Sequence, residues 1–181
     1  MKIYELESQA NKYDYFVIGD DKVVDQMLFD YKFDGNRVAH RWQPVKVKID
    51  EKDERPCDKP TFSYGPVFSR RALDILGDII GSNVEILPLI YEKGDYYLIN
   101  VINLLDCINY EKAQYIPFSS GRPMRFVQYS FKENLVKSVD IFKIVEFPKV
   151  TVFVSEKFKE VVTKNKLTGF KFIEVWDSEK E

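Results

Sequence analysis

Histidine and cysteine are scarce in this sequence, and their scarcity limits the chemistry that the chain can support. The 181 residues include one histidine and two cysteines. None of the three has the HExxH, CxxC or HxH spacing that is typical of a zinc site. The mixed acidic and basic run at 50–55 lacks the ligand order of a calcium-binding loop and is typical of a solvated loop. We therefore expect no metal site.

Long hydrophobic runs and a strong net charge are also absent. The first five residues lack the basic and apolar segments of a signal peptide, and no apolar stretch approaches the roughly 20 residues that a membrane-spanning helix needs. Lysine and arginine number 27 against 29 acidic residues, a formal charge of −2, which predicts no extended basic surface for nucleic acid. We expect a cytoplasmic protein with neither a membrane nor a nucleic-acid partner.

The two cysteines lie in unlike surroundings. Cys57 is in a polar stretch flanked by prolines, whereas Cys107 is in the apolar run 104–108. The two could form a disulfide, but unpaired thiols are the rule in a reducing compartment. We expect one exposed thiol, Cys57, and one buried thiol, Cys107.

Apolar and aromatic residues, in contrast, are abundant. Hydrophobic residues make up 45% of the chain and aromatic residues 15%, which is enough apolar surface to offset the loss of chain entropy on folding. A chain of this length normally forms one domain. We expect a single domain over residues 1–181, with a frayed tail at 177–181.

Three segments carry the signals of a helix. Each begins with a side chain that can act as an N-cap: Asp20 or Asp21, Ser69, and Ser155. Apolar residues then recur with the helical period, and in the second segment they place Leu73 and Leu76 on the inward face. Gly81 supplies the left-handed stop of that helix.

Short runs rich in aromatic and β-branched residues predict strands. These runs are at 2–6, 13–18, 45–49, 84–91, 96–101, 125–131, 140–146, 150–154 and 170–176. The turn at 92–95 predicts a central hairpin, and Pro88 predicts an edge or a bulge in its first strand, because proline cannot donate to a ladder. The expected fold is α+β, a mostly antiparallel twisted sheet with about three helices.

A few residues could form an anion-binding or catalytic site. His40 is the one candidate for a histidine general base. Arg122 and Arg125 follow a serine- and glycine-containing stretch that could hold a phosphate or carboxylate, although it lacks the order of a P-loop. One hypothesis is therefore a small-ligand binding protein or enzyme that uses His40, Arg122 and Arg125.

Apolar core positions form a distinctive pattern over residues 62–176. Its segments are 66–69 with Leu73 and Leu76, then 84–89, 96–101, 105–108, 152–158 and 167–172. This pattern resembles immunity protein family eleven, a bacterial family once catalogued as a domain of unknown function and found beside polymorphic toxins. The first 60 residues share only a short N-terminal strand pattern with it.

The resemblance implies a protein that neutralises a cognate toxin by stoichiometric binding, with no catalytic centre and no cofactor. The toxin would be encoded next to this chain, which would act as a monomer or a weak homo-oligomer. Tryptophan, tyrosine and arginine are over-represented at binding hot spots. We therefore predict partner contacts at Trp42, Tyr64, Arg122 and Arg125, together with the irregular loop 50–66.

A third hypothesis is an assembly subunit that associates with copies of itself through an exposed sheet edge near Pro88.

Overall fold

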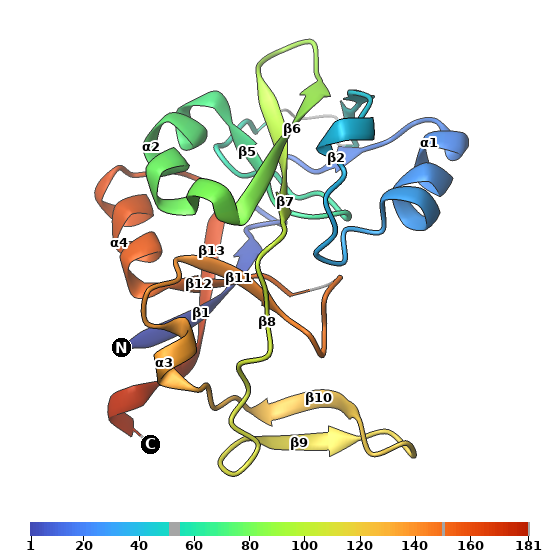
Figure 1. Cartoon of the computed structure of the whole chain (residues 1–181). Coiled ribbons are helices and arrows are strands. Elements are labelled where there is room, and N and C mark those ends of the chain that lie inside the picture. Colours follow the sequence, from blue (N-terminus) through green and yellow to red (C-terminus); the bar gives the residue numbers. More distant parts are fainter. Residues whose placement is uncertain (51–54, 150, 181) are drawn as a thin grey trace.

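The computed structural model of the chain describes residues 1–50, 55–149 and 151–180 and contains two main β-sheets with helices packed against them (Figure 1). The described residues form four α-helices, where about three were predicted. Most of the strand pairs are antiparallel. The predicted α+β class is confirmed.

The larger sheet has five strands in the order β13-β1-β12-β11-β8. These strands are β1 (Lys2–Ser8), β8 (Leu104–Leu105), β11 (Ile141–Ile144), β12 (Phe153–Ser155) and β13 (Phe170–Asp177). The β11–β8 pair is parallel, and the other pairs are antiparallel. The first and last strands of the chain therefore lie side by side in one sheet.

The smaller sheet has four strands in the order β3-β6-β7-β5. They are β3 (Val45–Lys46), β5 (Val67–Ser69), β6 (Val84–Ile90) and β7 (Tyr96–Val101). The β6–β7 pair is the predicted central hairpin. The predicted edge at Pro88 is wrong, because β6 has a neighbour on each side. The short β3 pairs only with Leu89 and Ile90, so its ladder does not require the missing N–H of Pro88.

Two further strand pairs lie outside the main sheets. One joins β2 (Phe16–Val17) to β4 (Lys48–Ile49), and the other joins β9 (Gln114–Pro117) to β10 (Pro123–Gln128). The sequence predicted β10 approximately but missed β9. The β9–β10 hairpin projects from one end of the molecule in Figure 1.

The three predicted helices begin at predicted caps, Asp20, Ser69 and Ser155, whereas the other helices and turns were not predicted. The full set is α1 (Asp21–Asp25), a π-helix η1 (Gln26–Tyr31), α2 (Arg70–Ile80), α3 (Glu133–Val136), α4 (Glu156–Lys164), and the 3-10 turns η2 (Ala39–Arg41), η3 (Gly81–Asn83) and η4 (Ser178–Lys180). The Oγ atoms of Ser69 and Ser155 each accept a backbone N–H at 3.1 Å. Gly81 ends α2 with a φ of 44°.

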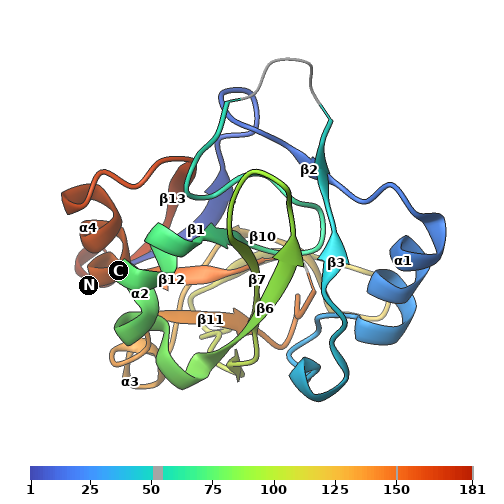
Figure 2. The same ribbon diagram turned by 90° about the horizontal axis from the view of Figure 1, so that it is seen from above.

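Three clusters of buried side chains form the core. The first lies under α2 and α4, which pack against each other (Figure 2), and contains residues of both sheets. Alternation along the strands sends Leu98 into the second cluster and Ile99 into the first. It likewise sends Phe153 into the third cluster and Val154 into the first. Both faces of each sheet are therefore covered.

Both cysteines are buried and free, so the prediction of an exposed Cys57 is wrong. The polar residues around Cys57 misled the prediction, because they form hydrogen bonds inside the protein. Residues 57–60 are buried in the predicted partner-facing loop, while residues 51–54 of that loop lie outside the described residues. Burial raises the pKa of Cys57 and that of Cys107 to about 12.

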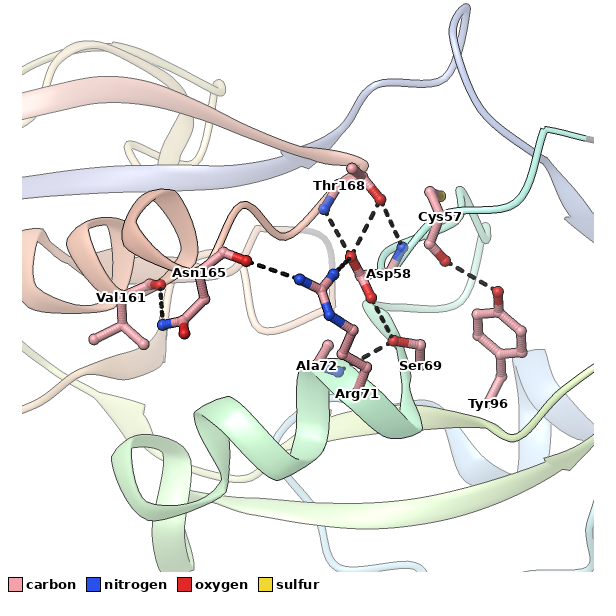
Figure 3. Close-up of polar contacts among 9 residues, drawn as sticks. All are labelled: Cys57, Asp58, Ser69, Arg71, Ala72, Tyr96, Val161, Asn165 and Thr168. Atoms are coloured by element: carbon pink, nitrogen blue, oxygen red, sulfur yellow. Dashed lines mark hydrogen bonds and ion pairs between the residues drawn. The ribbon is translucent and has the colours of Figure 1, made fainter.

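Asp58 joins three segments that are distant in the sequence (Figure 3). Its carboxylate accepts hydrogen bonds from Ser69 Oγ at 2.9 Å and from Arg71 Nη1 at 2.7 Å, both at the start of α2. It also accepts the Thr168 backbone N–H at 2.9 Å and the Thr168 hydroxyl at 3.2 Å, just before β13. One buried carboxylate thus binds the 55–66 loop to a helix and to the last strand.

Backbone hydrogen bonds also join the three segments of this junction. The Ser69 N–H donates to the Asp58 carbonyl at 2.8 Å, and the Lys59 N–H donates to the Thr168 carbonyl at 3.1 Å. Gly169 has a φ of 86°, and a Cβ atom there would lie 2.4 Å from the Lys59 carbonyl oxygen. Only glycine allows the two segments to approach this closely.

The buried thiols lead to a reactivity prediction. At pH 8 the native protein should react with Ellman's reagent at least about a hundredfold more slowly than the protein unfolded in guanidinium, because the thiolate fraction is small and the sulfur atoms are covered. Two equivalents should react after unfolding. A stoichiometric fast reaction of one thiol in the native protein would contradict the buried position of Cys57.

The junction leads to a stability prediction. Asp58→Ala should lower the free energy of unfolding by roughly 3–5 kcal/mol, because it leaves an arginine and several buried donors without their acceptor. Asp78→Ala is the matched control, since Asp78 is an exposed aspartate of α2, and it should change stability by less than about 0.5 kcal/mol. Urea unfolding measures both, and equal midpoints would show that Asp58 does not hold the junction.

Candidate functional site

A groove runs between the β9–β10 hairpin and the chain that follows β11. It encloses a volume of about 720 Å³. The side chains that line it are Asp106, Tyr110, Phe118, Arg122, Pro123, Met124, Val145, Glu146 and Phe147. Three separate parts of the chain therefore form its walls.

The hairpin has a tight tip that presents two of these side chains. The Phe118 N–H donates to the Arg122 carbonyl at 2.8 Å, and the Gly121 N–H donates to the Phe118 carbonyl at 2.9 Å. Gly121 has a φ of 82°, a conformation that favours glycine. The tip is thus closed by its own backbone, and Phe118 and Arg122 lie at its two ends.

An aromatic cluster anchors the hairpin to the third core cluster. The Phe126 ring of β10 lies 4.8 Å from the Tyr129 ring, 5.7 Å from the Phe147 ring and 5.8 Å from the Tyr115 ring, measured between centroids. Such contacts hold aromatic rings in defined orientations. The base of the hairpin is therefore packed, although its tip projects.

The groove exposes several large apolar side chains. Phe118 is 53% exposed, Tyr110 45%, and Met124 and Val145 each 44%. Single exposed apolar residues are common on protein surfaces, but a contiguous group in a concave site is typical of a binding surface. The arrangement favours contact with an apolar part of another molecule.

Two acidic residues, Asp106 and Glu146, line this groove, and Glu146 has a hydrogen-bond partner within it. The Tyr110 hydroxyl donates to Glu146 Oε1 at 2.5 Å. Desolvation and this hydrogen bond raise the pKa of Tyr110, so the phenol stays protonated. The other oxygen, Glu146 Oε2, is buried and accepts no hydrogen bond from the described residues. This oxygen is an unsatisfied acceptor beneath the groove surface.

The predicted contact residues do not form one patch. Arg122 lines the groove, and Arg125 is exposed on β10 but is not among the lining residues. Trp42 is half-buried in the second core cluster, where its Nε1–H donates to the Pro88 carbonyl at 2.9 Å. Tyr64 lines a different cavity. Only the hairpin arginines are near the groove.

The residues of the alternative anion site do not converge. His40 is exposed on η2, which packs beside β6. Arg122 and Arg125 belong to the β9–β10 hairpin, at the opposite end of the molecule from β6 in Figure 1. A site that uses all three side chains together therefore has no support in this structure.

Sequence reasoning missed most of the groove. Phe118, Met124 and Val145 are apolar and were not distinguished from core residues, and Tyr110 was not singled out. The signal that could have identified the hairpin is Gly121 between two short runs that contain β-branched and aromatic residues. The approach of residues 145–147 to the hairpin is a tertiary feature with no local signal.

The described residues contain neither a cluster of metal ligands nor a membrane-spanning helix. Within 1–50, 55–149 and 151–180, no group of three or more histidine, cysteine, aspartate or glutamate side chains could hold a metal ion. No helix in the same ranges is both long enough and apolar enough to cross a membrane.

The groove and its hairpin lie in the part of the chain that matches a known family model. Residues 90–177 match the model of the immunity protein family Imm11. The predicted resemblance to an immunity protein family is confirmed. The Imm11 match extends from the end of β6 to the end of β13, so it includes all the residues that line the groove. Two segments of the predicted resemblance, 66–69 and 84–89, precede the match. No curated protein matches this sequence significantly.

Proposed function

We propose that this chain is an immunity protein that binds a cognate bacterial toxin through the β9–β10 hairpin and its groove. Binding would be stoichiometric and would neutralise the toxin by covering or locking it, with no catalytic step and no cofactor. The complex would form in the cytoplasm of the cell that produces both proteins.

One observation carries this proposal: the large exposed apolar groove lies inside the residues that match Imm11. Binding hot spots cluster in pockets where aromatic and apolar side chains exclude water. The packed base around Phe126 supports a preorganised hairpin, which lowers the entropy cost of association.

The polar groups of the groove indicate what the partner should present. An apolar side chain of the toxin would contact Phe118, Met124 and Val145, and a cation beside it would suit the acidic residues Asp106 and Glu146 that also line the groove. Arg122 at the rim would suit a carboxylate of the partner. A surface of mixed charge around an apolar centre is the usual composition of a transient interface.

The direct experiment is a growth test with the product of the neighbouring gene. We expect expression of that product alone to arrest growth, and co-expression of this chain to restore growth and yield a 1:1 complex on co-purification. A toxic neighbour that neither binds this chain nor is neutralised by it would overturn the proposal.

The location of the interface gives a sharper prediction. Phe118→Ala should raise the Kd for the toxin at least about 30-fold, equivalent to about 2 kcal/mol, because it removes an aromatic anchor from the groove. Isothermal titration calorimetry with the purified toxin measures this change.

Phe29→Ala provides a matched control for that experiment. Phe29 is an equally large aromatic that is 67% exposed, but it lies on η1, away from the hairpin. Its replacement should leave the Kd within about twofold of the wild-type value. A large loss of affinity for Phe29→Ala with none for Phe118→Ala would place the interface on the opposite side of the protein.

A further inference from the structure

We propose that a second cavity, with the ammonium group of Lys59 at its base, binds a small organic anion that has a carboxylate or phosphate head group and an apolar body. This site is separate from the hairpin groove and does not depend on the proposed toxin binding. It encloses about 350 Å³ and is lined by β1, the 27–33 segment, the 62–66 segment, Lys59, Lys149 and Val152.

Lys59 is the central observation. Its side chain is among the least exposed charged groups of the described residues, at 3% for the residue as a whole. Its Nζ donates to Ser8 Oγ at 2.6 Å. The nearby carboxylate of Glu7 is paired with Lys171 at 2.5 Å. The buried ammonium therefore has a neutral hydroxyl as its hydrogen-bond partner and forms no ion pair with the carboxylates of residues 1–50, 55–149 and 151–180.

Such an arrangement is costly without a further partner. Burying an ammonium group removes its hydration, and a single neutral acceptor does not replace it. Burial accordingly lowers the pKa of Lys59 to about 8. An anion in the cavity would supply the missing negative charge and would occupy the remaining ammonium donors.

Lys143 is a second buried lysine, and it provides a comparison for Lys59 because it lines neither cavity. Lys143 Nζ donates to the Phe33 backbone carbonyl at 2.6 Å. Burial also lowers the pKa of Lys143 to about 8, but this side chain lines neither the Lys59 cavity nor the hairpin groove. The distinguishing feature of Lys59 is thus that it lines a cavity together with its hydrogen-bond partner, Ser8.

The mouth of the cavity has features that suit an anion. Lys32 and Lys149 both line it, and both are exposed there, which raises the local positive potential. Lys32 and Phe33 have φ values of 61° and 48°, in the left-handed region that non-glycine residues rarely adopt. Strained backbone of this kind gathers at ligand-binding sites, where the surroundings hold it in place.

The remaining walls define the body of the ligand. Met27, Phe33, Phe62 and Val152 contribute apolar surface, while Ser63 and Tyr64 contribute polar groups. A cavity of this size accommodates a molecule of about one aromatic ring with a charged substituent. Inorganic phosphate alone would leave the apolar walls uncovered.

Calorimetric titration with benzoate and with phenyl phosphate tests the proposal, and benzyl alcohol serves as the uncharged probe. We expect saturable binding of at least one anion to the full-length chain and none of the alcohol. The tighter of the two anions identifies the preferred head group. Absence of saturable binding for both anions up to about 10 mM would overturn the proposal.

Lys59→Met and the matched variant Lys143→Met locate the site. Each replaces a buried ammonium with an apolar side chain of similar length, so their effects on folding should be comparable. Lys59→Met should weaken anion binding at least tenfold, and Lys143→Met should leave it within about twofold. Unchanged binding in a folded Lys59→Met protein would place the anion elsewhere and refute the site.

A surface variant keeps the test valid if Lys59→Met fails to fold. The double variant Lys32→Met/Lys149→Met changes two exposed residues and should retain the fold. It should weaken anion binding severalfold and make the affinity less sensitive to salt, because two charges leave the mouth. An unchanged affinity and salt dependence would exclude the cavity as the binding site.

Discussion

The Asp58 carboxylate is the interaction on which the rest of the structure depends. It is buried, and it accepts hydrogen bonds from the start of α2 and from the residues that precede β13. The first of these segments leads from the smaller sheet, and the second leads into the larger one. Since both sheets contribute to the core under α2 and α4, this carboxylate fixes how they are joined.

The same junction borders one of the two candidate binding sites. The Asp58 side chain accepts hydrogen bonds from Thr168, while the next residue, Lys59, lines the smaller cavity. The hairpin groove lies instead beyond the third core cluster, where aromatic packing around Phe126 holds the base of β10. A rigid centre thus supports a projecting hairpin, an arrangement suited to protein recognition.

The sequence correctly predicted elements that are stabilised by hydrogen bonds between residues close together in the chain. Ser69 and Ser155 cap their helices because a hydroxyl near free N–H groups needs no tertiary partner. The predictions for Cys57 and Pro88 were wrong because distant segments set the surroundings of both residues. Thr168 binds the buried loop that contains Cys57, and β3 pairs with the strand that contains Pro88. The groove was largely missed for the same reason: Val145 and Phe118 meet only in the folded chain, and only Arg122 was anticipated.

Hydrogen exchange of the chain, measured alone and in complex with the product of the neighbouring gene, tests the central claim most directly. The account predicts that the toxin slows amide exchange in residues 114–128 and 145–147, with little change in α1 and η1. Protection confined to α1 and η1, or to the Lys59 cavity, with the hairpin unaffected, would contradict the assignment of the groove as the toxin-binding surface.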